Sequence, residues 1–317
     1  MRHVSALPAF FKEHIARREW RWLIKKKSFK IQGGLSRYLY LVPAAVIYIT
    51  VIIVPSIYTF HTSFFRWNGV NPNKPFVGFQ NYEILFTRDP TFRQAITNNF
   101  IWVLMTVIIT VSVALGFALL INRPFRGRTF FRGSLYFPYV LSGIVVSITW
   151  IWVYQPQLGL LTSFTQAIGL GPFPIALLSN PNTALFSVYL ASMWQTVGAP
   201  MILFLAGLQT IPKDLIEAAR IDGAGVFQGF RFITIPMLRE TFVIVIATQI
   251  INSMKVFDVL RGMTGGGPGT STQTLAYYMV TQTFTYANYG LGSAIAVIMV
   301  LLMMIIVIPY VLHMSKN

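Results

Sequence analysis

Four long stretches of this 317-residue chain contain no Asp, Glu, Lys or Arg. They cover residues 38–65, 94–122, 133–212 and 262–315. A membrane-spanning helix needs roughly 20 apolar residues, and each stretch is long enough for at least one. Only 11% of the residues are charged, whereas soluble globular domains carry about 25%. The charge pattern therefore excludes a water-soluble protein and predicts an all-α integral membrane protein.

The longest charge-free stretch, residues 133–212, is too long for one span. It divides at residues 156–182, where Pro, Gly, Ser and Asn cluster as they do in loops. With this division the chain is expected to contain six transmembrane helices. Their approximate ranges are 38–60, 98–121, 135–155, 184–208, 239–260 and 289–312. The fifth range gives the weakest signal, because Lys255 and Asp258 lie near its end.

Lys and Arg are unevenly distributed among the loops that connect these ranges. If the N-terminus lies inside, 19 of the 25 Lys and Arg residues fall in cytoplasmic segments. Such an excess is typical of the cytoplasmic side of membrane proteins, so both termini are predicted to be cytoplasmic. This topology explains the net charge of +16 without any need for nucleic acid.

The topology divides the chain into four parts. Residues 1–37 form a basic cytoplasmic segment, and residues 38–95 hold the first span and an outer loop. Residues 96–312 form the transmembrane core, and residues 313–317 a cytoplasmic tail. Basic and aromatic residues are interleaved over residues 10–31. This pattern fits either a helix lying in the inner membrane interface or a loose basic tail that sets the topology.

The inner loop between the fourth and fifth spans, residues 211–236, carries the most informative pattern. Pro212 suits the first position of a helix, and Glu217 favours the positive end of the helix dipole. Gly223 stands where a glycine in the left-handed conformation ends a helix. A second short helix then runs to Pro236. The sequence predicts a helix, a tight turn and a helix on the inner membrane face.

This loop resembles the EAA loop of ABC-transporter permeases, in which Glu-Ala-Ala is followed at fixed spacing by Gly and by Ile-x-Leu-Pro. The matching positions are Glu217, Ala218, Ala219, Gly223, Ile233 and Pro236, with Asp222 directly before the glycine and Ile235 in place of the usual Leu. In that family the loop is a coupling helix that docks in a groove on the ATP-hydrolysing subunit. The resemblance implies that these residues form the ATPase-coupling loop.

A second set of motifs is similar to the carbohydrate-uptake permeases of the maltose F-subunit type. It comprises Phe257-Asp258, the run from Thr264 to Pro268, Thr272 and Thr274, and residues 76–82 of the first outer loop. The resemblance implies a type I ABC importer permease fold and binding-protein-dependent import of a sugar or oligosaccharide across a prokaryotic cytoplasmic (inner) membrane. It also implies a second six-span permease subunit, two ATPase subunits and an extracytoplasmic solute-binding protein.

The chain carries no signature of an enzyme or of a bound cofactor. It has no cysteine, and its four histidines are scattered without ligand spacing. The glycine-rich run at residues 265–269 lacks the Gly-Lys-Ser/Thr signature of a phosphate-binding loop, so a conformationally permissive outer turn explains it. We expect no catalytic residue, metal or cofactor in this chain, with ATP and Mg bound by the partner ATPase subunits.

Polar side chains at membrane depth are costly and therefore mark candidate substrate contacts. Gln249 lies near the middle of the fifth span, and Asn252 and Ser253 follow it. Trp194 and Gln195 reach a similar depth in the fourth span. Amide and hydroxyl groups can bind sugar hydroxyls, and a flat aromatic ring can cover a C–H face. Alternatively, the amides only form hydrogen bonds with neighbouring helices.

Lys255 is the sixth candidate for the substrate path. It can pair with Asp258 three residues later if the helix continues. It either snorkels to the outer boundary or attracts an anionic sugar. Glycerol phosphate and polyamines are alternative solutes for a permease of this kind. An ion-driven secondary carrier is a further alternative, although it would need acidic residues within the membrane, where only Asp258 lies, near an edge.

Overall fold

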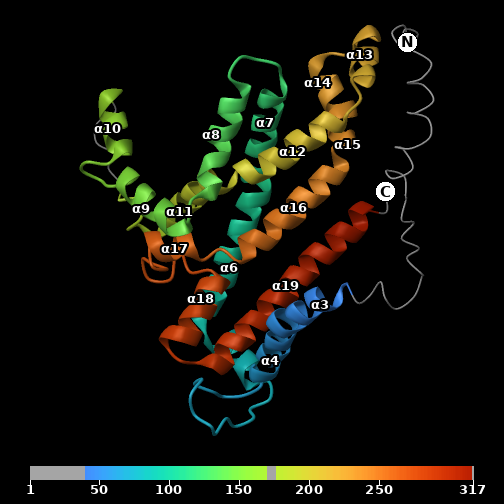
Figure 1. Cartoon of the computed structure of the whole chain (residues 1–317). Helices are drawn as coiled ribbons and strands as arrows, with labels where there is room; N and C mark the ends of the chain where they lie inside the picture. Colours follow the sequence, from blue (N-terminus) through green and yellow to red (C-terminus); the bar gives the residue numbers. More distant parts are fainter. Residues whose placement is uncertain (1–39, 170–175, 316–317) are drawn as a thin grey trace, which may run out of the picture. The chain divides into compact units, whose positions relative to one another are not determined.

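The computed structural model describes residues 40–169 and 176–315 (Figure 1). Every regular element in these two ranges is helical, and one isolated antiparallel bridge joins Phe65 to Phe76. The prediction of an all-α protein is confirmed. The possible interfacial helix at residues 10–31 lies outside the described residues. The chain divides into two compact units, residues 1–56 and 57–317.

The described part of the first unit is a single apolar helix that continues into the start of the second unit. It comprises α3 (Val42–Tyr48), the π-helical η1 (Ile49–Ile53) and α4 (Val54–Thr62). Together they give 21 helical residues with a mean hydropathy of 1.9. Apolar side chains cover all its faces, as expected for a helix surrounded by lipid. The helix matches the predicted range 38–60 apart from its ends.

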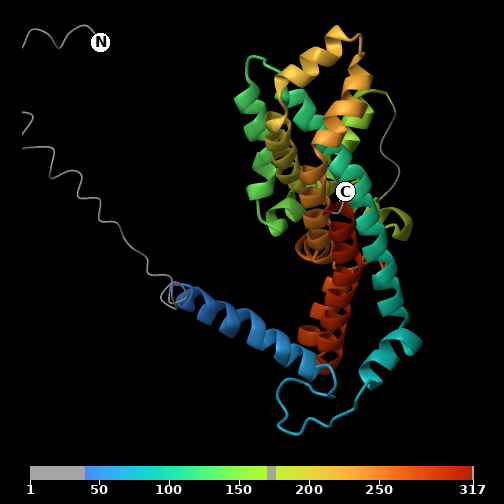
Figure 2. The ribbon, with the colours of Figure 1, turned by 90° about the vertical axis from the view of Figure 1, so that its right-hand side faces the viewer.

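The second unit contains the remaining helices, which Figure 2 shows from the side. They are α5 (Gln80–Glu83), η2 (Ile84–Arg88), α6 (Pro90–Met105), η3 (Thr106–Thr110), α7 (Val111–Asn122), α8 (Arg128–Val140), α9 (Gly143–Val153), α10 (Leu160–Ala167), α11 (Pro181–Thr196), α12 (Gly198–Thr210), α13 (Lys213–Ile221), α14 (Val226–Gly229), η4 (Phe230–Thr234), α15 (Ile235–Met237), α16 (Arg239–Met254), α17 (Asp258–Met263), α18 (Leu275–Val280), η5 (Thr281–Thr285) and α19 (Tyr289–Ser315).

Two of the predicted spans in this unit are continuous helices. The helix Pro90–Asn122, made of α6, η3 and α7, has 33 residues, and the helix Tyr289–Met314 has 26. Both are long and apolar enough to cross a membrane. The first begins eight residues before the predicted range 98–121. Asp89 explains this early start, because its side chain accepts a hydrogen bond from the backbone N–H of Phe92 and caps α6.

Two other predicted spans are broken. The expectation of one helix over residues 135–155 is wrong, because α8 and α9 meet at 104°. Ser142 has an extended backbone there and caps α9 through Val145 N–H. The helix expected at 184–208 bends by 46° between α11 and α12. At this bend the backbones of α12 and α8 touch, since a Cβ atom at Gly198 would lie 2.6 Å from the carbonyl oxygen of Leu135.

The fifth predicted range, residues 239–260, is also interrupted. α16 ends at Met254, and the N–H of Lys255 bonds the carbonyl of Asn252 in a tight turn. α16 alone has 16 residues, fewer than the roughly 20 that cross a hydrocarbon core. The loop expected at residues 156–182 is not entirely irregular either, since it contains the helix α10.

Three clusters of buried apolar side chains hold the second unit together. The first joins α6, α16, α18 and α19, and the second joins α7, α12 and α16. The third joins α9, α11 and α17 around Trp102 of α6 and Tyr189 of α11. α16 contributes to two clusters, so it connects the packing around α19 with the packing around α12. Figure 1 shows α16 and α19 side by side.

Two adjacent buried asparagines of α6 hold the loop that follows α17. Asn98 Nδ2 lies 2.8–3.3 Å from three backbone carbonyls in residues 270–273. Asn99 Oδ1 accepts a hydrogen bond from the N–H of Leu275 at 3.1 Å. Three glycines of the loop have φ between 60° and 86°. The prediction of a conformationally permissive turn at residues 265–269 is therefore confirmed.

We expect Asn98→Ala to lower the free energy of unfolding by about 1–3 kcal/mol, because buried carbonyls lose their donor. Thr97→Ala is the matched control, since Thr97 is exposed and its hydroxyl bonds only its own helix. Thermal unfolding of the purified protein in detergent, followed by circular dichroism, measures both variants. Equal midpoints for the two variants would contradict the role of Asn98.

Candidate functional site

The loop at residues 211–236 forms two helices joined by a turn, as the sequence predicts. α13 begins at Lys213, so Pro212 lies one position before the helix rather than at its first residue. The second helix continues through α14, η4 and α15 and ends at Met237. The N–H of Gly225 bonds Gln228 Oε1 at 2.8 Å and fixes its start.

Gly223 makes the turn between these two helices. Its φ is +84°, in the left-handed region. The N–H of Gly223 bonds the carbonyl of Arg220 at 3.1 Å, and the N–H of Ala224 bonds the carbonyl of Ala219 at 2.9 Å. These are the two hydrogen bonds of a Schellman motif. The role predicted for Gly223 as the helix stop is confirmed, and the turn is fixed by the chain's own backbone.

The loop at residues 211–236 exposes large apolar side chains in addition to its motif residues. Ile221 is 86% exposed, Phe227 75% and Phe232 71%. Glu217 and Ala218 are also exposed. Of the other motif residues, Asp222, Gly223 and Pro236 are exposed, whereas Ala219 and Ile233 are half-buried. Apolar side chains grouped on an exposed surface mark an interaction site.

The turn of this loop borders a hollow of about 320 Å³. Asp222 and Gly223 line one side, and Gln228 and Phe232 line the other. Ile221, Phe227 and Phe232 were not predicted from the sequence as part of this surface. Their signal was available, because they are large apolar residues in a loop that also carries six charged side chains.

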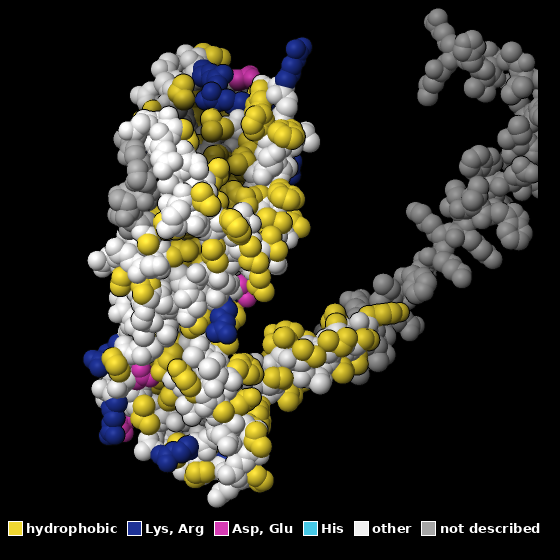
Figure 3. All heavy atoms as spheres, turned by 90° about the vertical axis from the view of Figure 1, so that its left-hand side faces the viewer, with side chains coloured by type: hydrophobic (Ala, Val, Ile, Leu, Met, Phe, Trp, Pro, Cys, Tyr) yellow, Lys and Arg dark blue, Asp and Glu magenta, His cyan; other side chains and the backbone are white. Residues whose placement is uncertain are grey.

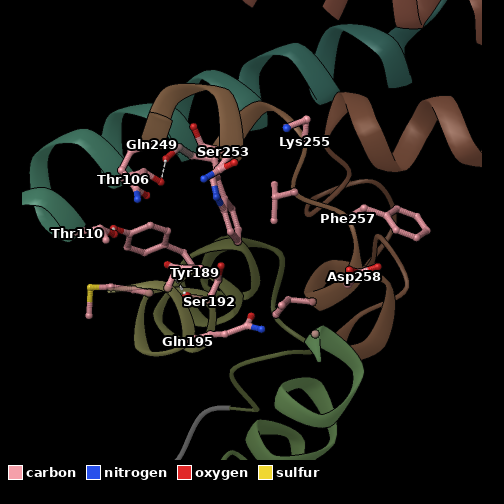
Figure 4. Close-up of a pocket in the computed structure, with 17 residues that line it drawn as sticks. Thr106, Thr110, Tyr189, Ser192, Gln195, Gln249, Ser253, Lys255, Phe257 and Asp258 are labelled. Carbon is pink, nitrogen blue, oxygen red and sulfur yellow. Dashed lines mark hydrogen bonds between the residues drawn. The ribbon is translucent and has the colours of Figure 1, made fainter. Parts of the chain in front are cut away.

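A cavity of about 180 Å³ lies between η3, α11, α16 and the turn before α17 (Figure 4). Five of the six residues predicted for the substrate path line it, namely Gln195, Gln249, Asn252, Ser253 and Lys255. Gln249 and Ser253 enter from one side, and Gln195 enters from the opposite side. Trp194 does not line the cavity, because its ring packs edge-on against Trp150 at a centroid distance of 5.9 Å.

The polar groups in this cavity differ in their free hydrogen-bonding capacity. Gln249 is 6% exposed, yet its amide has no hydrogen-bond partner within the part of the chain that the structure describes. The hydroxyl of Ser253 donates to the carbonyl of Ile250 at 2.8 Å. Gln195 Nε2 donates to the carbonyl of Leu141 at 2.8 Å, which leaves its oxygen free. Gln249 therefore keeps both amide atoms for a molecule in the cavity.

One wall of the cavity was not predicted from the sequence. It is formed by Trp102, Thr106 and Thr110 of the second predicted span, with Tyr189 of α11. The rings of Trp102 and Tyr189 meet edge to face at 5.5 Å. The Tyr189 hydroxyl lies 2.8 Å from Thr110 Oγ1 and donates to the carbonyl of Met105. Two threonines four residues apart in an apolar helix were the available signal.

The cavity also carries one positive and one negative side chain. Lys255 and Asp258 both line it, but the predicted pairing between them is wrong, because the helix ends between the two residues. Among the described residues, the ion pair found is Arg88 with Glu83 at 3.6 Å. The same residues include no group of three or more His, Asp or Glu side chains that could hold a metal ion.

Known proteins match this chain over most of its length. The sequence profile described as "Binding-protein-dependent transport system inner membrane component" matches residues 108–314. The probable ABC transporter permease protein YurN of Bacillus subtilis is 35% identical over 84% of this chain and 91% of its own length. The trehalose/maltose transport system permease protein MalF of Thermococcus litoralis is 33% identical over 86% of this chain and 92% of its own length. The sulfoquinovosyl glycerol transport system permease protein SmoG of Agrobacterium fabrum is 36% identical over 87% of each chain.

A solved structure has the same fold. It belongs to a bacterial ABC transporter involved in the import of the acidic polysaccharide alginate, and it superposes with a TM-score of 0.78. The match covers 89% of this chain and 97% of the other, at 20% sequence identity. The profile match spans the loop at residues 211–236 and all the residues that line the cavity except Trp102 and Thr106. The chain therefore belongs to the binding-protein-dependent transport system inner membrane components, the permease subunits of ABC importers.

Proposed function

We propose that this chain is the permease subunit of an ATP-driven, binding-protein-dependent importer that moves a sugar or oligosaccharide across a prokaryotic cytoplasmic membrane. One observation carries the proposal, namely the unpartnered Gln249 amide in a cavity where polar residues of separate helices meet. Amides, hydroxyls and aromatic rings suit a polyhydroxylated solute. The similarity to a permease named for trehalose and maltose supports the same substrate class.

The proposed topology has six spans with both termini in the cytoplasm. The bent pairs α8–α9 and α11–α12 each serve as one span, and α16 crosses with the turn at Lys255. Among the described residues, three helices are long and apolar enough to cross a membrane, or up to five if each bent pair forms one span. Short α16 is tolerated because it packs in two buried clusters rather than against lipid. The distribution of Lys and Arg supports the orientation.

The small cavity supports a second six-span permease subunit as a partner. Its volume of about 180 Å³ is less than the roughly 300–1,000 Å³ of a ligand pocket. Asn252, Lys255 and Asp258 line it and are exposed in the isolated chain. A second permease subunit against this open side would complete the substrate path.

Two further partners follow from the proposed function. The exposed coupling loop would dock on one of two ATPase subunits, which bind ATP and Mg. An extracytoplasmic solute-binding protein would deliver the solute. One structure of the alginate transporter contains a periplasmic protein with bound alginate pentasaccharide. That complex supports the same kind of partner for this chain.

The position of the coupling loop explains how an ATPase can act on the cavity. The loop follows α12 directly and leads directly into α16. α16 carries Gln249, and α12 follows α11, which carries Gln195. A movement of the gripped loop would therefore shift two walls of the cavity together. ATP binding biases two states of the permease through this one rigid element.

We expect Gln249→Ala to raise the concentration for half-maximal uptake about twofold to tenfold, the effect of losing one or two net hydrogen bonds. Ser253→Ala should act in the same direction but more weakly, because its hydroxyl proton is already bound by Ile250. Thr248→Ala is the control, since Thr248 is exposed and bonds only its own helix. Uptake of labelled saccharide into proteoliposomes that hold the whole transporter measures all three.

The same proteoliposomes test the transport class. Uptake should require ATP on the ATPase side and should continue when ionophores remove ion gradients. Ion-gradient-driven uptake without ATP would refute the proposal in favour of a secondary carrier. Unchanged apparent affinity in both the Gln249 and Ser253 variants would remove these residues from the substrate path.

A further inference from the structure

A second, larger cavity of about 590 Å³ lies between the coupling loop and the ends of α7 and α12. Its volume falls within the range of roughly 300–1,000 Å³ that is typical of ligand sites. The substrate-path residues do not line it, and it sits on the side of α13 opposite to exposed Glu217 and Ala218. The importer function proposed above gives this cavity no role.

The charge of this cavity is of one sign. Arg123, directly after α7, and Arg220 of α13 both line it, and no Asp or Glu does. Neither guanidinium group forms an ion pair or a side-chain hydrogen bond with any residue in the described ranges. Figure 3 shows Lys and Arg side chains gathered at this end of the unit, with acidic side chains beside them, next to a hollowed surface of hydrophobic side chains. The cavity is therefore complementary to an anion.

The rest of the lining is apolar. Leu119, Leu208, Ile211, Ile216 and Phe230 all contribute to it. A free anion in water gains nothing from such a wall, whereas a molecule with an anionic head and a hydrocarbon chain uses both parts of it. The cavity also lies where the charge-free helix α7 ends and the basic inner segment begins, which is the depth of a lipid headgroup.

We propose that this cavity binds an anionic phospholipid of the inner leaflet, with its phosphate at Arg123 and Arg220 and an acyl chain along α7 and α12. This inference rests on the membrane orientation proposed above. A lipid in this place would pack between the coupling loop and the spans that the loop moves. It would thereby stiffen the contact through which the ATPase acts.

The test measures the lipid that stays with the whole transporter. The complex is exchanged into phosphatidylcholine nanodiscs containing phosphatidylglycerol, extracted in mild detergent and analysed by native mass spectrometry. Arg123→Gln with Arg220→Gln should weaken phosphatidylglycerol binding roughly a hundredfold, because each arginine loses a charge-assisted hydrogen bond to the phosphate that contributes about a factor of ten. Arg123→Lys with Arg220→Lys should retain most of the binding.

The control pair is Arg128→Gln with Arg132→Gln, which removes the same charge from α8 outside the cavity. It should change the retained phosphatidylglycerol by less than about twofold, because no direct contact to the phosphate is lost and mild detergent extracts the lipids held only by general surface charge. An equal loss in the control pair would reduce the effect to general surface charge and overturn the proposal. Competition by soluble glycerol phosphate as strong as that by the lipid would also overturn it.

A label identifies the occupant directly. The chain contains no cysteine, so a benzophenone attached to Phe230→Cys marks one site in the cavity wall. Photolysis in the same nanodiscs should yield an adduct with phospholipid. An adduct with an ATPase subunit, or with residues 1–39 of this chain, would overturn the proposal. Neither readout requires transport, so a failed lipid site and a failed transport proposal give different results.

Discussion

Gly223→Val is expected to lower ATP-driven uptake roughly fivefold to thirtyfold, because valine at this position costs about 1–2 kcal/mol. The φ of +84° is the cause, since a β-branched residue is strained in the left-handed region. No neighbouring atom lies within 4 Å of a Cβ atom built at Gly223. The expected loss is therefore conformational and not a steric clash. Relief of the strain would open the Schellman turn and misalign α14 relative to α13.

Gly223→Asn is the matched control for this prediction. Asparagine tolerates the left-handed conformation and commonly ends helices in place of glycine. It should keep uptake within about twofold of the unmodified transporter. Co-purification of the second permease subunit and membrane insertion should be normal in both variants. If valine and asparagine affected uptake equally, the conformation of the turn would not be what the ATPase uses.

The conformation of the loop at residues 211–236 could be predicted from the sequence because its information is local. Gly223 stands just after a helical pattern, at the position where a glycine ends a helix. Its backbone has the expected left-handed conformation. The approximate ranges of the apolar helices could be predicted for the same reason, because the absence of charged residues along a stretch determines them. The positions at which the helices end could be predicted less well. The breaks at Ser142 and Gly198 depend on a cap and on backbone contact with α8.

The cavity could be predicted only in part. Depth along a helix predicted that Gln195 and Gln249 lie at one level, and both residues line one cavity in the structure. The depth of a residue along a helix does not determine where its side chain points, and the ring of Trp194 packs against Trp150 instead. The wall of Trp102, Thr106 and Thr110 comes from a helix far away in the sequence. Its position depends on how α6 and α11 pack, which a single sequence does not state.

Glu217→Arg is expected to cause the largest loss, a weakening of ATPase binding by roughly thirtyfold to several thousandfold. Glu217 is exposed on α13 beside Ala218, and it forms no ion pair with any described residue. If the loop docks in a groove on the ATPase, this carboxylate is buried and paired with a cation there. Removing one member of such a pair costs about 2–5 kcal/mol, and arginine adds repulsion. Co-purification of the ATPase subunits and their transport-stimulated ATP hydrolysis both measure the loss.

The control for this charge reversal is Glu240→Arg. Glu240 is also exposed, but it lies in the first turn of α16 and outside residues 211–236. The two variants change the net charge equally, so general electrostatic attraction affects both alike. Glu217→Gln should fall between them, because it removes the charge pair without adding repulsion. Full ATPase binding by Glu217→Arg would mean that the exposed face of α13 is not the docking surface, whereas equal losses at Glu217 and Glu240 would assign the effect to the overall charge of the inner face. A loss confined to Glu217 would support one docking surface for the ATPase. This surface would consist of the exposed apolar side chains of Ile221, Phe227 and Phe232, with the charge of Glu217 at its edge.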